Sequence, residues 1–180
     1  MLSLLPDHAD PWRLCALGKA YEGEIALAEL PRLAPLLASE EGEAAFSLAF
    51  DRDADGRPRV RVHVRASLPV QCQRCLGAVQ IEVDADSTLV LVSGPDEAER
   101  LPDEFDPLLV EDQSLALSSL IEDELILAIP AAPVHPVETC AVKLDDINAP
   151  EAQPEESAGE AANNPFAALA NWKNDDESRD

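Results

Sequence analysis

The middle of the chain alternates between apolar and polar positions, as half-buried β-strands do. In residues 57–68 the valines and Ala66 occupy every second position, and basic side chains fill most of the positions between them. Residues 45–51 alternate in a similar way, and Asp53-Ala54-Asp55-Gly56 between the two stretches is typical of a turn. The pattern predicts a β-hairpin, followed by a further strand over residues 79–92.

Shorter signals flank this hairpin. A strand is expected at residues 20–28, and the next leucines have the spacing of one helical face: Leu30, Leu33, Leu36 and Leu37. After a short strand at 108–110, a second helix is predicted from an N-cap at Ser114 to Pro130, which ends it. The expected fold class is α+β, with two helices packed on an antiparallel sheet or small open β-barrel of about five strands.

The composition changes after residue 142, where a single α+β domain at 1–142 is expected to end. Residues 143–162 are rich in Glu, Ala and Pro, which predicts a flexible acidic linker. Asn164-Pro165 then has the pattern of a helix start, so a short C-terminal helical motif is predicted at 163–174. Its large apolar side chains recur at i, i+3 and i+6: Phe166, Leu169 and Trp172. This motif docks either on a partner or on the chain's own core.

Charge and cysteine content narrow the class of protein. The 180 residues carry a formal charge of −23, of which −18 lies in residues 91–180, so the whole molecule repels nucleic acid at long range. Aromatic residues make up only 4%, which argues against a surface that stacks on unpaired bases. Four cysteines are too few for a disulfide scaffold, and no apolar run approaches the ~20 residues of a membrane span. We therefore expect a cytoplasmic protein with no membrane partner.

Two distant segments offer ligands for a metal ion. Cys72 and Cys75 form a CxxC motif at the expected turn between two strands, and His135 and Cys140 come after the second predicted helix. Three thiols and one imidazole can complete a tetrahedral zinc site if these segments meet. The alternative is that both CxxC cysteines are small buried apolar residues and His135 is a surface imidazole. A redox role is less favoured, because the motif does not open a helix.

A row of basic side chains is the candidate surface for RNA. The 18 residues from 57 to 74 contain no acid and carry six basic side chains: Arg57, Arg59, Arg61, His63, Arg65 and Arg74. Guanidinium groups in a row suit phosphate oxygens. The alternative is that they pair with acids on neighbouring strands. The acids at 122–124 have two interpretations as well: a solvated helix face that pairs with the basic row, or a surface for a basic protein partner.

Three motifs in this order resemble the YceD family, the large ribosomal RNA subunit accumulation proteins. They are the Cys72–Cys75 motif, the segment from Glu122 to His135 with Cys140 behind it, and the terminal Asn164-Pro165-Phe166-Ala167-Ala168-Leu169-Ala170. The resemblance covers most of the chain beyond residue 40. It implies a bacterial cytoplasmic protein needed for normal accumulation of large-subunit ribosomal RNA, and it implies no known catalytic activity.

The sequence contains no Gly-rich phosphate loop, no GxSxG motif and no HExxH motif, so an enzyme is not indicated. The predicted function is a non-catalytic factor that supports accumulation and processing of 23S ribosomal RNA, with large-subunit RNA or its precursor particle as partner. Two alternatives stay open. One is a zinc- or thiol-dependent RNA-maturation enzyme that uses the Cys and His residues, and the other is an acidic chaperone for a basic ribosomal protein.

Overall fold

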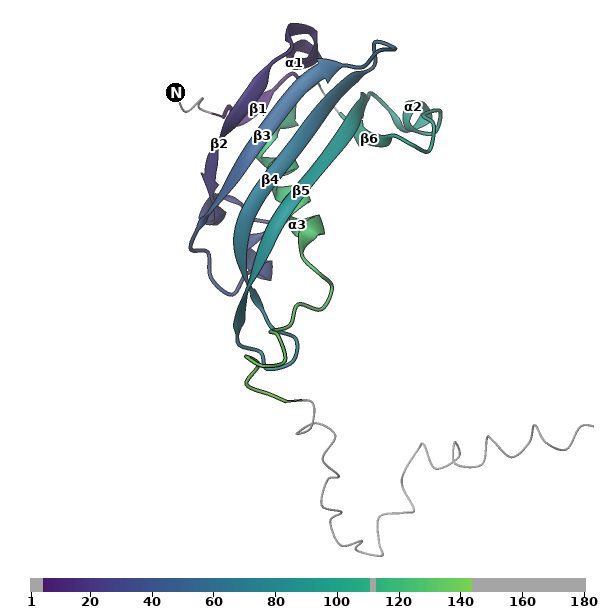
Figure 1. Ribbon diagram of the computed structural model, residues 1–180. Coiled ribbons are helices and arrows are strands. Elements are labelled where there is room, and N and C mark those ends of the chain that lie inside the picture. The colour runs from purple at the N-terminus through teal and green to yellow at the C-terminus, as the bar shows by residue number, and fades with distance from the viewer. Residues whose placement is uncertain (1–4, 111–112, 144–180) are drawn as a thin grey trace, which may run out of the picture. The chain divides into compact units, whose positions relative to one another are not determined.

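A computed structural model describes residues 5–110 and 113–143 of the chain. Figure 1 shows these residues in colour, with one twisted sheet as the largest feature. The compact unit that contains the sheet ends at Val142. The predicted linker and the predicted C-terminal motif therefore lie outside the described residues, apart from Lys143.

The sheet has five strands in the order β2-β3-β4-β5-β6. Its strands are β2 (Ala20–Ala26), β3 (Glu43–Arg52), β4 (Pro58–Gln71), β5 (Ala78–Val92) and β6 (Asp106–Leu109). The first four pair antiparallel in sequence order, as the hairpin pattern predicts. The last pair, β5 with β6, is parallel, and the described strands form an open sheet and no closed barrel.

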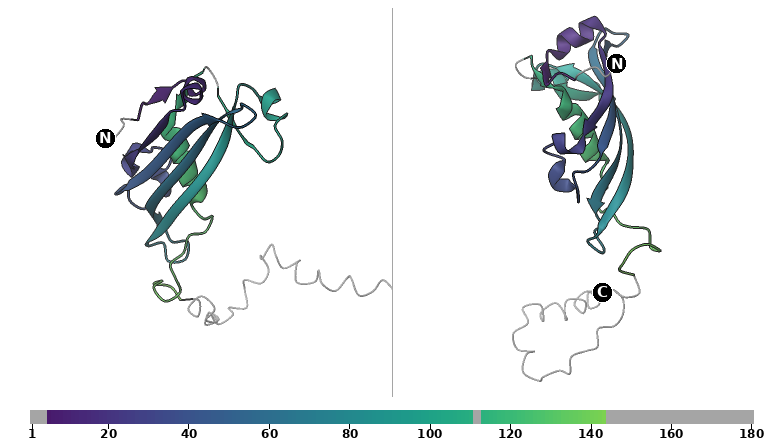
Figure 2. Two further views of the ribbon diagram at one scale, coloured as in Figure 1. Left: turned by 45° about the horizontal axis from the view of Figure 1, so that its top comes forward. Right: turned by 90° about the vertical axis from the view of Figure 1, so that its left-hand side faces the viewer.

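Helices cover one face of this sheet, which confirms the α+β class. The helices are α1 (Pro11–Leu17), the four-residue α2 (Pro95–Ala98) and α3 (Leu117–Ala128). Figure 2 (right) shows the sheet on edge, with α1 and α3 on the same side of it. A small second sheet joins β1 (His8–Ala9) to β7 (Leu115–Ala116), directly before α3.

Apolar side chains from the inner sheet face and from α3 form the core. Inward positions of β4 include Val60, Val62 and Val64, all at most 1% exposed, and Ala66 at 8%, so the alternation predicted for this strand is confirmed. Phe50 of β3 and the buried residues of α3 pack in the same cluster: Leu117, Leu120, Ile121 and Leu125. The opposite sheet face has no such layer in the described part and carries polar and charged side chains.

The sequence pattern missed α1, although its ends carry clear signals. Asp10 caps the helix by accepting a hydrogen bond from the backbone N–H of Arg13 (3.2 Å), and Pro11 occupies its first turn. Gly18 ends the helix in the left-handed conformation, with a φ of 59°. Buried Leu14 and Cys15 attach this short helix to the core.

Two predicted helices differ from the structure. The leucines at 30–37 form no α-helix: two 3-10 helices occupy Leu27–Glu29 and Ala34–Leu36. Pro31 explains the break, because proline disfavours the helical conformation of the residue before it, and Leu30 accordingly has a φ of −111° and a ψ of 83°. The second helix begins at Leu117, after the β7 pairing, and not at Ser114.

Glu122 is the one charged side chain among the buried residues of the described ranges, at 3% exposure. One carboxylate oxygen accepts hydrogen bonds from the backbone N–H groups of Arg32 (2.5 Å) and Leu33 (3.0 Å). The neighbouring Asp123 pairs with the Arg32 guanidinium, and Glu124 accepts a hydrogen bond from the Ser87 hydroxyl. The expectation of a solvated acidic helix face that pairs with the basic row is therefore wrong for Glu122, which joins α3 to the turn between the 3-10 helices.

We expect Glu122→Ala to lower the free energy of unfolding by about 2 kcal/mol, because the part-buried N–H of Arg32 loses its acceptor and the buried N–H of Leu33 keeps only its bond to the carbonyl of Leu30. Urea unfolding followed by circular dichroism measures this loss. Asp123→Ala is the matched control: its ion pair with Arg32 is about half exposed, so its loss costs under ~1 kcal/mol. An equal loss of unfolding free energy in the two variants would show that the hydrogen bonds of Glu122 stabilise the fold no more than an exposed ion pair does.

Candidate metal centre

The CxxC motif lies in the six-residue turn that joins β4 to β5. The strands are in register up to the pair Gln71 and Ala78, so residues 72–77 must reverse the chain alone. The backbone N–H of Leu76 donates to the carbonyl of Cys72 (2.9 Å), and Leu76 takes a left-handed conformation with a φ of 60°. This tight turn places both thiols on the same side of the hairpin end.

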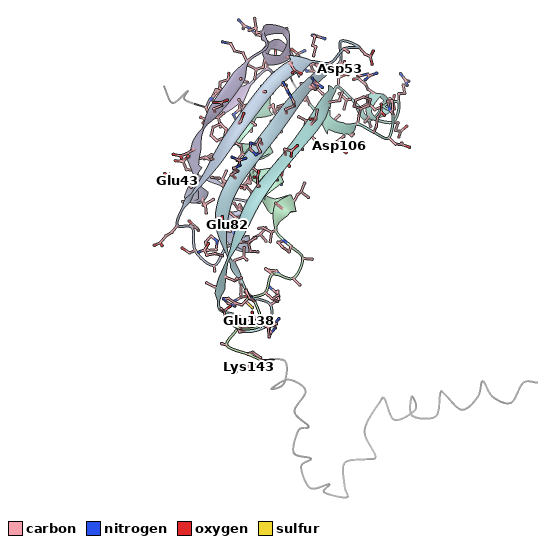
Figure 3. The ribbon with its side chains drawn as sticks, viewed as in Figure 1. Glu43, Asp53, Glu82, Asp106, Glu138 and Lys143 are labelled. Carbon is pink, nitrogen blue, oxygen red and sulfur yellow. The ribbon has the colours of Figure 1, made fainter. Side chains whose placement is uncertain are left out.

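The segment after α3 packs against that turn. The carbonyl of Pro133 accepts a hydrogen bond from the backbone N–H of Gln73 (2.8 Å), which fixes the two segments side by side. A second turn comes next, in which the backbone N–H of Cys140 donates to the carbonyl of Pro136 (3.0 Å). Figure 3 shows Glu138 of this segment beside the hairpin end, with Asp53 at the opposite end of the sheet.

The four predicted ligands meet. One ligand atom from each of Cys72, Cys75, His135 and Cys140 lies within 4.8 Å of all the others. A tetrahedral zinc ion with Zn–S bonds of about 2.3 Å holds its sulfurs roughly 3.8 Å apart, so only a small contraction separates this cluster from a bound geometry. The expectation that the turn and the His135–Cys140 segment lie close together is confirmed.

Hydrogen bonds orient the imidazole for this role. Its Nδ1 atom lies 3.4 Å from the Cys75 sulfur, and its Nε2 atom lies 2.9 Å from the carbonyl oxygen of Ala78. The carbonyl can only accept a hydrogen bond, so Nε2 carries the proton, which leaves Nδ1 unprotonated in the neutral ring and aimed at the thiols. The Ala78 carbonyl is a part of the site that the sequence does not signal, because any residue supplies one.

The electrostatics of the cluster favour the thiolate form that binds metals. Burial alone would raise the pKa of Cys72. Backbone N–H groups of Cys75, His135 and Arg74, together with the His135 ring in its protonated form, donate to its sulfur and lower that pKa to about 5. The hydrogen bond with Cys72 in turn raises the pKa of His135, against the opposing effect of burial, and Cys75 adds to the rise. A cation at this point would take the place of the imidazole proton.

Most of the basic row is paired with acids. Arg59 and Arg61 both contact the carboxylate of Asp51, at 2.6 and 2.7 Å. His63 and Arg65 share Asp84, at 2.8 and 3.1 Å. Both acids lie on the strands adjacent to β4, and Asp51 and Asp84 stand directly opposite Arg59 and Arg65 in the sheet register. These pairs lower the pKa of each carboxyl group, chiefly through the hydrogen bonds from Arg59 and from His63 respectively.

The two ends of the basic row have other surroundings. Arg57 pairs with Asp53 and Asp55 in the β3–β4 turn and lies over the ring of Phe105, 4.7 Å from its centroid. Arg74 lies in the CxxC turn, where one buried guanidinium nitrogen has no hydrogen-bond partner. Whether any of the six side chains contacts RNA stays a prediction. The three docking candidates, Phe166, Leu169 and Trp172, lie outside the described residues.

Within the described residues, the longest helices fall short of the length and apolar character of a membrane span.

The catalytic centre proposed as an alternative would use the same Cys and His residues, and the structure places all four in one closed cluster at the hairpin end. The CxxC motif belongs to the turn between β4 and β5 and does not open a helix, as the sequence predicts.

Comparison with known proteins gives the same family as the motifs. The family model described as large ribosomal RNA subunit accumulation protein YceD matches residues 60–173. A Haemophilus influenzae protein named large ribosomal RNA subunit accumulation protein YceD is 32% identical over 170 residues, which cover 94% of this chain and 96% of that protein. No solved structure matches the chain. With a family match over more than half of its length and a relative of this similarity, the chain belongs to the YceD family.

Proposed function

We propose that this protein is a cytoplasmic, non-catalytic factor that supports the accumulation of 23S ribosomal RNA. The observation that carries the proposal is the match, along almost the whole chain, to a relative named for accumulation of the large ribosomal RNA subunit. The four-ligand cluster supports the non-catalytic part of the proposal. A cation held by four protein ligands has no position left for water or substrate, which is the arrangement of structural zinc sites and not of catalytic ones.

A strain that lacks the gene tests this role. Its ratio of 23S to 16S ribosomal RNA should fall, and the gene supplied in trans should restore it. The Cys72→Ser variant should restore it poorly if the metal centre supports the active fold. An unchanged RNA ratio in the deletion strain would contradict the proposal. Recovery of a basic ribosomal protein without RNA in a crosslinked pull-down would instead favour the chaperone function.

We propose zinc as the ion in the cluster, with a structural role. Bound to three thiolates and the Nδ1 atom of His135, it would fasten the β4–β5 turn to the segment after α3. The buried thiols of Cys72 and Cys140, the low pKa of Cys72 and the carbonyl that orients the imidazole all suit such an ion. The chemistry that zinc supplies here is a cross-link between two chain segments.

The purified full chain should contain one zinc ion per molecule under reducing conditions. Cys72→Ser should lose the ion and lower the thermal midpoint, since a structural zinc ion contributes to the stability of the folded state. Inductively coupled plasma mass spectrometry measures the zinc. Cys15→Ser is the control: this buried thiol lies outside the cluster and donates to the carbonyl of Arg59. A chain without zinc, or equal zinc in the two variants, would contradict the assignment.

We propose that Arg61 and Arg65 are the RNA-contacting members of the basic row. Their side chains are 55% and 64% exposed, the largest values for arginines among the ion pairs of β4. Each uses one guanidinium nitrogen in its ion pair, so the remaining donors face solvent. Because Asp51 and Asp84 partly neutralise these arginines, contact with phosphates should be weak and sensitive to salt.

Replacement of both arginines by Gln should weaken binding to a 23S ribosomal RNA fragment and lower the salt slope of the binding constant by about 2, one for each lost phosphate contact. Fluorescence anisotropy at several salt concentrations measures both effects. Arg100→Gln is a control, because it removes a positive charge from an exposed residue away from β4. An unchanged salt slope in the double variant would exclude these side chains as RNA contacts.

A further inference from the structure

An uncharged groove of about 740 Å³ lies next to the metal centre. One wall is the second 3-10 helix with the residues after it, another is the β4–β5 turn, and the third is the end of α3 with the segment behind it. Its 14 lining residues include no charged side chain, and only Gln71 and Gln73 are polar. Leu36 and Leu76 are 46% and 66% exposed at this groove, so apolar surface there faces solvent in the described structure.

Such a groove is unusual for a chain with a charge of −23, in which about a quarter of the residues are charged. One stretch of the chain beyond the compact unit has the same character. Residues 164–172 belong to a stretch without any charge that runs from residue 161 to residue 172, between Glu160 and Lys173. The YceD family model matches as far as residue 173, so this stretch belongs to the family pattern and is not an unrelated extension.

We propose that residues 164–172 of the same chain occupy this groove through Phe166, Leu169 and Trp172. Their spacing of i, i+3 and i+6 gathers the three side chains on one side of a helix, which is how an apolar helix enters a groove. The occupant brings no charge to a site that could not neutralise one, so its burial requires no unpaired ion.

The point at which the chain leaves the compact unit favours this occupant over a separate protein. The unit ends at Val142, two residues after Cys140. The Cys140 sulfur lies within 4.8 Å of the Cys72 sulfur, and the carbonyl of Cys72 accepts from the backbone N–H of Leu76 in the groove wall. The 21 residues from 143 to 163 span roughly 25 Å as a flexible chain, which is enough to reach the groove from its own edge.

Attachment to the same chain also raises the effective concentration of the segment. A short flexible linker gives a local concentration on the order of 1 mM. A contact with a dissociation constant of ~0.1 mM, too weak for most separate proteins in a cell, would then be occupied roughly ten to one. The proposal is independent of the function proposed above, because it concerns the chain alone.

The test uses the full chain labelled with 5-fluorotryptophan. The protein has two tryptophans, Trp12 and Trp172, so ¹⁹F NMR gives two resonances, and Trp12→Phe assigns them. A soluble paramagnetic relaxation agent then reports how far Trp172 is exposed to solvent. Leu36→Glu and Leu76→Glu each place a carboxylate in the groove. Leu109→Glu is the matched control, since Leu109 has the same 46% exposure as Leu36 but lies on β6.

We expect Trp172 to be shielded in the unaltered chain and in Leu109→Glu, and its relaxation enhancement to rise at least about threefold in both groove variants, because an ion in the groove opposes apolar burial. The Trp12 resonance should stay unchanged and shows that the domain is folded. Full exposure of Trp172 in the unaltered chain would overturn the proposal. So would shielding that persists in both groove variants, or shielding that disappears on dilution, which would indicate a second copy as the partner.

Discussion

The packing of α3 on the inner face of the sheet is the contact on which the rest of the structure depends. Four apolar side chains of α3 are buried there, and the helix contacts both β4 and β5. That position brings Glu122 against the turn at Arg32 and Leu33, where its carboxylate accepts hydrogen bonds from both backbone N–H groups. It also ends the helix at Ala128 near the end of the hairpin, so the residues after it reach the CxxC turn within a few positions.

The sequence predicted the parts that depend on local periodicity. A period of two over β4 specifies which side chains face the core, and the CxxC spacing allows one turn to present two thiols. The proximity of His135 and Cys140 to that turn depends on tertiary packing. From the sequence they could be proposed only because their residue types, together with the CxxC motif, fit zinc. Helix boundaries failed where proline or a short β-pairing overrode leucine spacing, as at Pro31 and at Leu115.

Ionic partners were harder to predict, because they depend on strand register and on burial. Thirty-six acids offer many partners for each arginine, and only the register selects Asp51 for Arg59 and Asp84 for Arg65. Glu122 and Asp123 are neighbours in sequence but differ in burial: Glu122 is buried, whereas Asp123 pairs with Arg32 at the surface. The rotation of the helix about its axis decides which of the two acids is buried, and amino-acid composition does not predict that rotation.

The sequence separation of the metal ligands has a consequence for synthesis of the protein. His135 lies 60 residues after Cys75 and 63 after Cys72, so an emerging chain shows two thiols long before it shows the other two ligands. All four ligands become available only when nearly the whole domain has left the ribosome, and a half-site of two thiols holds zinc weakly. Retention of the ion would thus mark molecules whose domain is complete, and broken chains that end before residue 135 would stay without it.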